Sequence, residues 1–167
     1  MSAAFRVVLL PNANGLAHTS RCLAIAHAMR RLGPQVQILC AGSGPAMDLA
    51  RGLNIEVVPI RENDHARLLA GVRSTGLPDF GDGDALRQQL ADQEALIQEV
   101  SPDVIVSDWN PTARLAALRC TVAHVAVSNT VLTPARAIPF TRIRPRALFD
   151  RTANALEQRV ISRSARK

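Results

Sequence analysis

His18 and Asp108 are the residues of this sequence whose types and spacing are best suited to acid–base chemistry. His18 lies in the segment NANGLAHTSR and Asp108 in the segment VIVSDWNP. A carboxylate that accepts a hydrogen bond from one imidazole nitrogen leaves the other nitrogen as a lone-pair base. Such a base can take a proton from a hydroxyl group whose oxygen attacks a carbon atom. The same residues could instead cap the helices that follow them, and spacing alone slightly favours this structural interpretation.

Other kinds of site fit the segment around His18 less well. NANGLAHT lacks the Gly-x-Gly-x-x-Gly spacing of dinucleotide-binding loops, and no acidic residue follows the second apolar run. The sequence also lacks the Gly-Lys-Ser/Thr of a phosphate-binding loop. His18, Cys22 and His27 lie near one another in the sequence without a second cluster of ligands, so no metal site is expected.

Five apolar runs are expected to form the strands that position His18 and Asp108. Short runs of Val, Ile and Leu bounded by turn residues are typical of buried strands. The expected strands cover residues 5–10, 36–40, 55–60, 104–107 and 122–127. Thr19 or Ser20 is expected to cap the helix after the first strand, and Asn110 a later helix that begins with Pro111.

Strands that alternate with helices predict an α/β fold, in which a Rossmann-like parallel sheet of a single domain carries helices on both faces. The simplest strand order is 3-2-1-4-5, in which strands 1 and 4 are neighbours and the direction of winding reverses between them. Ligands of open α/β sheets bind at the carboxyl ends of the strands at this point. His18 follows strand 1, Asp108 follows strand 4, and neighbouring strands lie about 4.8 Å apart. Both side chains are therefore expected to reach one crevice.

Composition excludes several classes of function. The sequence has 167 residues, of which 47% are hydrophobic and 20% charged, as in one globular domain. Aromatic residues make up only 3%, with no Tyr and one Trp, so a base-stacking nucleic-acid surface is not expected. No apolar run has the length of a membrane span, and the first residues lack the pattern of a signal peptide. The sequence therefore predicts a cytoplasmic protein.

Positive charge is concentrated in the last part of the sequence. Residues 134–167 contain nine Arg or Lys residues against Asp150 and Glu157, and the remaining residues sum to about −1. We therefore expect residues 1–133 to form the domain and residues 134–167 a basic helix or linker. A basic segment can contact a phospholipid surface, although solubility is the simpler explanation.

Two longer segments resemble motifs of a known enzyme family. GLAHTSRCLAIAHAMRRLG and PDVIVSDWNPTARLAALRCTVAHVAVSN are similar, in this order, to motifs in the N-terminal half of glycosyltransferases with two Rossmann domains, the GT-B architecture. Arg21, where many members have Pro, resembles the subgroup with a His-x-x-Arg motif. The sequence departs from the family at Ala17, which stands where Gly is usual, and at Pro34, which stands where His is usual.

The resemblance implies roles for individual residues. His18 would be the catalytic base of an inverting transferase, and Asp108 would orient it. Further residues on the matching motifs would line the substrate site: Gly15, Arg21, Asn110, Ser128 and Asn129. The reaction would move a sugar from a nucleotide-sugar, the co-substrate, to an acceptor hydroxyl, with no cofactor and no protein-bound metal.

The resemblance also implies a partner. In this family a second Rossmann domain holds most contacts to the nucleotide-sugar, so the chain is expected to need a donor-binding domain in cis or in trans. The acceptor would be a small molecule or a lipid, and residues 134–167 would be the part able to contact a membrane peripherally. Two alternatives remain open: a non-catalytic α/β module that binds a ligand or a partner, and half of a nucleotide-sugar epimerase.

Overall fold

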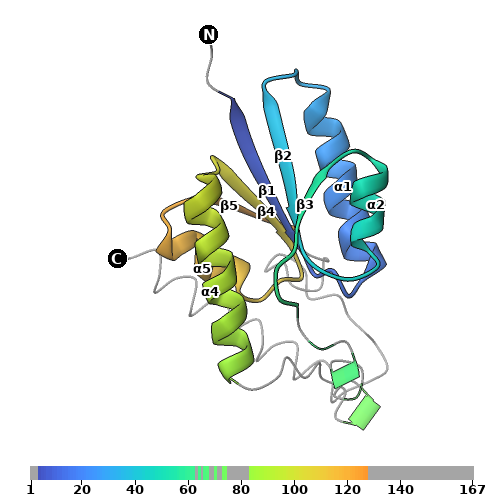
Figure 1. Cartoon of the computed structure of the whole chain (residues 1–167), viewed down its shortest axis with the longest axis vertical. Coiled ribbons are helices and arrows are strands. Elements are labelled where there is room, and N and C mark those ends of the chain that lie inside the picture. Colours follow the sequence, from blue (N-terminus) through green and yellow to red (C-terminus); the bar gives the residue numbers. More distant parts are fainter. Residues whose placement is uncertain are drawn as a thin grey trace, which may run out of the picture. The chain divides into compact units, whose positions relative to one another are not determined.

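A parallel sheet of five strands forms the centre of the unit that ends at Val127 (Figure 1). The computed structural model describes residues 4–62, 64, 66–67, 70, 73–74 and 83–127. The strands are β1 (Phe5–Pro11), β2 (Val36–Ala41), β3 (Glu56–Val58), β4 (Val104–Asp108) and β5 (Ala123–Val127). Their order is β3-β2-β1-β4-β5 and every pairing is parallel, so the predicted fold class and strand order are confirmed.

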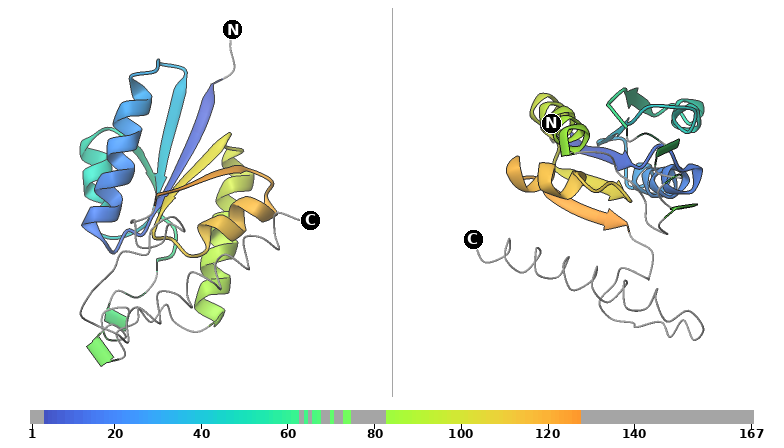
Figure 2. Two further views of the ribbon diagram at one scale, coloured as in Figure 1. Left: turned by 180° about the vertical axis from the view of Figure 1, so that it is seen from behind. Right: turned by 90° about the horizontal axis from the view of Figure 1, so that it is seen from below.

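Helices cover both faces of this sheet. The helices are α1 (Leu16–Arg30), α2 (Met47–Gly52), α4 (Gly83–Val100) and α5 (Ala113–Arg119). Figures 1 and 2 show α1 and α2 grouped together and α4 and α5 grouped together. Val7 and Leu9 of β1 belong to the hydrophobic cluster that includes buried residues of α1 and α2. Val8 and Leu10 belong to the hydrophobic cluster that includes buried residues of α4 and α5. The alternating side chains of one central strand thus divide the core into two layers.

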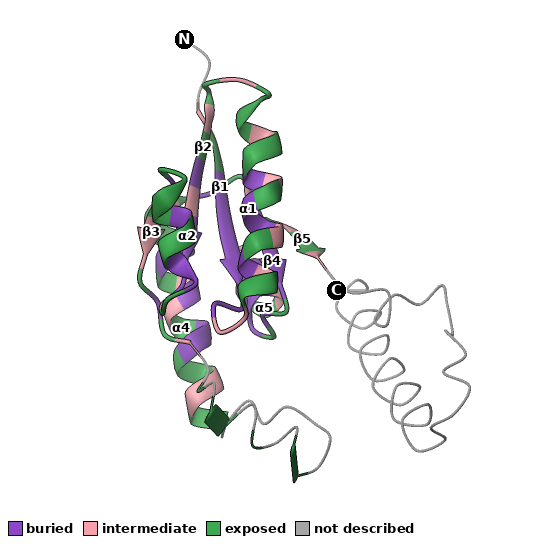
Figure 3. Cartoon of the chain, turned by 90° about the vertical axis from the view of Figure 1, so that its right-hand side faces the viewer, coloured by how far each residue is buried: buried purple, intermediate pink, exposed green. Residues whose placement is uncertain are grey.

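β1 has the longest buried run of the five strands, which explains its sequence. Residues 7–11 are all buried, as the colouring of Figure 3 shows along the strand. A strand covered on both faces reads as a continuous apolar run rather than an alternating one. The sequence FRVVLLP meets this requirement, and it fixes the carboxyl end of β1 firmly next to β4.

The start of α1 differs from the prediction. The helix begins at Leu16 with Gly15 as its N-cap, so Thr19 and Ser20 lie inside the helix and the expected cap was wrong. The carbonyl oxygen of Gly15 accepts hydrogen bonds from the backbone N–H groups of His18 and Thr19, at 3.1 and 3.2 Å. Glycine is an accepted N-cap residue because its carbonyl can start the helical ladder without a side chain. His18 therefore stands in the first turn of the helix rather than before it.

The start of α5 also differs from the prediction. The helix begins at Ala113 with Thr112 as its N-cap, so the expected cap at Asn110 was wrong. The Asn110 side chain is buried, and its Oδ1 accepts hydrogen bonds from Gln93 Nε2 at 3.0 Å and Thr112 Oγ1 at 3.1 Å. Asn110 thus ties the end of β4 to α4 and cannot cap the following helix with the same oxygen.

Some predictions concern residues outside those described. Ser128, Asn129, the expected boundary at residue 133 and the basic segment 134–167 all fall there. Among the residues that the structure describes, no helix combines the length and apolar character needed to cross a bilayer.

Candidate active site

The carboxyl ends of β1 and β4 bring His18 and Asp108 together. The two strands are paired so that Asp108 lies opposite Pro11, and the backbone N–H of Asn12 donates to the carbonyl oxygen of Asp108 at 2.8 Å. A tight loop then leads from Asn12 into α1, whose first turn carries His18. The side chain of His18 reaches back over the end of β4. This is the edge of the sheet at which the expected strand order predicts a crevice.

The geometry of the pair suits a hydrogen bond between imidazole and carboxylate. His18 Nδ1 lies 2.9 Å from Asp108 Oδ1. The Asp108 side chain is 0% exposed, whereas that of His18 is 20% exposed. The carboxylate is therefore sealed inside the protein, while the imidazole retains access to the surface.

Arg21 completes the surroundings of the buried carboxylate. Its Nε donates to Asp108 Oδ2 at 2.6 Å, and its Nη2 donates to Asp108 Oδ1 at 2.8 Å. The guanidinium therefore binds both carboxylate oxygens. Residues three apart on a helix share a face, which places Arg21 beside His18. The hydrogen bonds that Arg21 donates to Asp108 are the main reason why the pKa of Arg21 is raised above its ordinary value. This charge-assisted fork offsets the cost of burying the carboxylate.

Gly15 is required by the closeness of the His18 ring. A Cβ atom at this position would overlap His18 Cδ2 and would lie 3.3 Å from His18 Nε2. The backbone of Gly15 has φ −114°, which any residue can adopt, so the requirement is for space and not for conformation. Gly15 thus lies against the imidazole, and its predicted contact with substrate stays a prediction.

Trp109 covers the imidazole, although sequence reasoning did not single it out. The two rings are stacked, with centroids 5.8 Å apart and an interplanar angle of 21°. Trp109 is the single Trp of the sequence and directly follows Asp108, which was the signal available to find it. Gly15 and Trp109 together restrict how the His18 ring can turn.

The backbone of Trp109 is in the left-handed region, with φ 54°. Three further non-glycine residues among those described share this conformation, Asn54, Ser101 and Thr121, and each lies just beyond the end of a helix. Left-handed residues are common at that position. Trp109 instead follows a strand, and such strain in a bulky residue is typical of functional sites.

A second buried carboxyl group lies at the same edge of the sheet and was also missed. Glu62 follows β3, and a Cβ at Gly42 would come within 3.0 Å of its Oε1. Neither carboxyl oxygen has a hydrogen bond of normal geometry, although the backbone of Ala13 and Ser43 partly offsets the effect of burial. Burial raises the pKa of Glu62 to about 8. No local sequence pattern predicts this burial, because it depends on how three loops meet.

The remaining predicted residues are placed as follows. Asn110 bonds to α4 and Thr112 and not to His18 or Arg21, and Ser128 and Asn129 lie outside the described residues. At the same edge of the sheet, the loops after β1 and β2 form a hollow of about 340 Å³. Its lining is mostly apolar: Ala13, Asn14, Leu16, Pro45 and Ala46. In the part of the chain that the structure describes, no three His, Cys, Asp or Glu side chains gather as a metal site would require.

Comparison with known proteins gives matches in structure. No protein-family profile and no curated protein matches the chain. The solved structure of spinosyn forosaminyltransferase SpnP matches with a TM-score of 0.56 and 19% identity, over 74% of this chain and 31% of that one. The glycosyltransferase SsfS6 of Streptomyces sp. SF2575 matches with a TM-score of 0.56 and 15% identity, over 75% of this chain and 39% of that one. The chain shares their Rossmann-like α/β fold.

A third match is an enzyme of another class. A UDP-N-acetylglucosamine 2-epimerase matches with a TM-score of 0.53 and 11% identity, over 89% of this chain and 39% of that one. The chain thus spans between 31% and 39% of the length of these three proteins. Similarity at such low identity shows the fold, and function must be argued from the site itself.

Proposed function

We propose that the chain is the acceptor-binding half of an inverting glycosyltransferase, with His18 as its general base. The observation that carries this proposal is the pair formed by His18 Nδ1 and Asp108 Oδ1 at 2.9 Å, with the carboxylate buried and the imidazole partly exposed. It lies between the carboxyl ends of β1 and β4, where open α/β sheets bind ligands. The fold is the one found in the glycosyltransferases SpnP and SsfS6.

The arrangement can carry out an inverting displacement at an anomeric carbon. Asp108 accepts a hydrogen bond from His18 Nδ1–H, which leaves a lone pair on Nε2. Nε2 takes the proton of the acceptor hydroxyl as its oxygen forms a bond to the anomeric carbon. The bond from that carbon to the diphosphate oxygen breaks at the same time, and the nucleoside diphosphate leaves with the electron pair. The buried carboxylate stabilises the imidazolium that results.

The donor side of the reaction requires a second domain under this proposal. The chain spans about a third of the matched glycosyltransferases, which supports a donor-binding Rossmann domain supplied in cis or in trans. Catalysis depends on holding both substrates in register, so the chain alone should transfer sugar poorly. Titration calorimetry should show weak or undetectable binding of nucleotide-sugars to the isolated chain, and micromolar affinity would contradict the half-enzyme proposal.

The acceptor is proposed to be a small molecule or a lipid. The mostly apolar hollow at the carboxyl edge of the sheet supports an acceptor with an apolar surface. The nine basic residues within 134–167 would favour contact with an anionic membrane surface if the acceptor is a lipid. Sedimentation with anionic vesicles tests this contact, and equal binding to neutral vesicles would contradict a role for the basic charge.

The role of His18 is tested by substitution in protein that includes the donor domain. His18→Ala should lower the rate of transfer by about 10²- to 10⁴-fold, the usual contribution of a general base. His27→Ala is a matched control, because His27 is exposed on the same helix, and it should transfer at the wild-type rate. Equal rates for His18→Ala and wild type, with both proteins folded, would contradict the proposal.

Half of a nucleotide-sugar epimerase is the second candidate. It is supported by the epimerase structure that matches 89% of this chain. An epimerase would convert a nucleotide-sugar without any acceptor, whereas a transferase would release nucleoside diphosphate only with an acceptor present. Product analysis by chromatography and NMR therefore separates the two activities.

A further inference from the structure

His18 Nδ1 faces two groups of opposite charge at the same distance. It lies 2.9 Å from Asp108 Oδ1 and 2.9 Å from Arg21 Nη2. A neutral imidazole carries one N–H and one lone pair, on different nitrogens. Nδ1 can therefore donate to Asp108 only when it holds the proton, and it can accept from Arg21 only when it does not. The two neighbours favour opposite tautomers of one ring.

The tautomer decides whether His18 can act as a base. When Nδ1 holds the proton, the lone pair is on Nε2, the nitrogen that takes the acceptor proton in the proposed function. When Nδ1 accepts from Arg21, the proton sits on Nε2, which then has no lone pair to offer. Arg21 and Asp108 thus act on the same nitrogen with opposite consequences for Nε2.

We propose that Arg21 is a positioning residue that sets the tautomer of His18, and so the fraction of molecules whose Nε2 can act as base. The proposal rests on the proposed function for its catalytic meaning, but the tautomer itself can be measured without any reaction. Arg21 is the residue able to do this because its fork on Asp108 fixes Nη2 beside Nδ1. This role differs from the direct substrate contact that the family resemblance implies for Arg21.

The packing around the ring supports a competition between these two partners. Gly15 lies directly against Cδ2 of the imidazole, and Trp109 stacks on the ring. A ring held in this way cannot swing to a third partner without moving its neighbours. The pKa of Arg21 is raised, so its guanidinium stays charged and keeps its N–H groups throughout the working pH range.

The experiment is NMR of the protein labelled with ¹⁵N-histidine, in which the shifts of Nδ1 and Nε2 report the tautomer. In the wild type, His18 should show a mixture of tautomers. Arg21→Met removes the competing donor and should shift His18 to the form protonated at Nδ1. Asp108→Asn should shift it the opposite way, because an amide oxygen in place of Oδ2 accepts from Arg21 Nε and the amide nitrogen in place of Oδ1 then donates to Nδ1.

Two further variants keep the test decisive. Arg21→Lys retains a charge near Asp108 but lacks the planar fork, so it should shift the tautomer as Arg21→Met does even if the Met variant folds poorly. Arg30→Met is the matched control, since Arg30 lies on the same helix and donates to the carbonyl oxygens of Leu53 and Asn54. It should leave the His18 shifts unchanged.

The outcomes separate this inference from the proposed function. Opposite shifts for the Arg21 and Asp108 variants support the inference, whether or not the protein transfers sugar. Identical His18 shifts in wild type, Arg21→Lys and folded Arg21→Met would overturn it. A shifted tautomer together with wild-type transfer by His18→Ala would contradict the proposed function and leave the control by Arg21 standing.

Discussion

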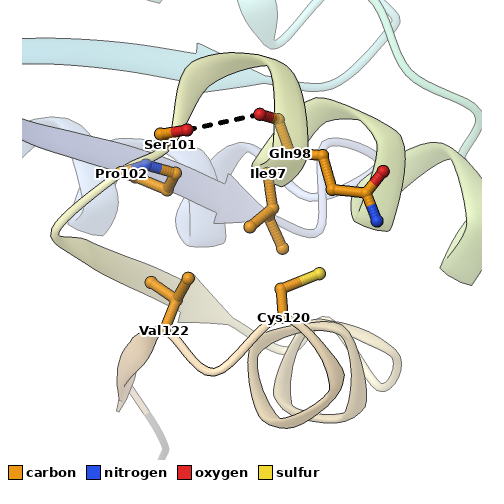
Figure 4. A pocket seen from close by; sticks show the side chains of 6 residues that line it. All are labelled: Ile97, Gln98, Ser101, Pro102, Cys120 and Val122. Atoms are coloured by element: carbon orange, nitrogen blue, oxygen red, sulfur yellow. Dashed lines mark hydrogen bonds between the residues drawn. The ribbon is translucent and has the colours of Figure 1, made fainter.

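The two edges of the sheet have hollows of similar size but very different surroundings. At the carboxyl edge, a hollow of about 340 Å³ is formed by the loops after β1 and β2, and the same edge carries a buried carboxylate, its arginine, an imidazole and a strained Trp109. At the amino edge, before β4, a hollow of about 370 Å³ opens between α4 and α5 (Figure 4). It is lined by Ile97, Gln98, Ser101, Pro102, Cys120 and Val122, with no acidic or basic side chain among them.

The hollow at the amino edge offers few groups that could take part in chemistry. Its one titratable lining group is Cys120, and burial together with Glu94 raises the pKa of this thiol, which makes it a poor nucleophile. Ser101 is left-handed because it lies just after α4, an ordinary place for such a residue. The comparison teaches that buried charge and a left-handed residue outside a helix end distinguish the two edges, whereas the volume of a hollow does not.

The largest effect at the carboxyl edge is expected from filling the space beside the Gly15 backbone. Gly15→Ala should push the imidazole away from Asp108 and lower transfer by about 10²-fold, since a shift of about 1 Å in a catalytic group has this effect. Gly52→Ala is the matched control, because nothing lies within 4 Å of the added Cβ. Steady-state kinetics checks both. Equal rates for Gly15→Ala and Gly52→Ala would contradict the need for close approach.

A pH-dependent measurement tests the second carboxyl group of the carboxyl edge. The pKa of Glu62 is about 8 in the folded protein, against an ordinary value of 4.5 for a Glu carboxyl group. Between these values the unfolded chain releases a proton that the folded chain keeps, so this group lowers stability as pH rises from 4.5 to 8. Glu62→Gln should therefore raise the Tm at pH 9 by several degrees, with little change at pH 4.

The exposed Glu56 of β3 provides the control for this measurement. Glu56→Gln should change the Tm by a similar small amount at both pH values, because its carboxyl group is solvated. A Glu62→Gln variant whose stability relative to wild type does not depend on pH would show that the Glu62 carboxyl is not buried in solution.

The smallest effect is expected from relieving the strain at Trp109. Glycine adopts a φ of 54° without penalty, whereas alanine does not. Trp109→Gly should therefore be more stable than Trp109→Ala by about 1 kcal/mol, measured by urea unfolding. Val125 is an exposed residue of β5 at which the order should reverse, because glycine weakens a strand. The same order at both positions would contradict the strain at Trp109.

The carboxyl edge was predictable from sequence where it depends on strand order. Apolar runs that alternate with helical segments predict the order 3-2-1-4-5, and this order places the ends of β1 and β4 side by side. His18 and Asp108 then lie near one another as a consequence of topology. The expected strand order was therefore sufficient to bring the two residues to one crevice, whereas their spacing alone slightly favoured helix capping.

The contacts of Arg21 were not predictable because they depend on where α1 begins. A helix that begins at Thr19 or Ser20 would not place His18 and Arg21 on the same face. The observed start at Leu16 does so, and it depends on a loop held by the carbonyl of Asn12, which accepts from Gly15 N–H at 3.0 Å. Trp109 and Glu62 are similar cases, because strain and burial arise from contacts between loops distant in sequence.

The central claim is that His18 and Asp108 act as one catalytic unit. The most direct measurement is the transfer rate, with the donor domain present, of His18→Ala, Asp108→Asn and the double variant. Asp103→Asn at the amino end of the same strand serves as control and should transfer at the wild-type rate. If the pair is one unit, the double variant should be no slower than His18→Ala, since removing either member already abolishes its action. The claim would be contradicted if the fold-losses in transfer rate of the two single variants multiplied in the double variant. Transfer by Asp108→Asn at the wild-type rate would also contradict it.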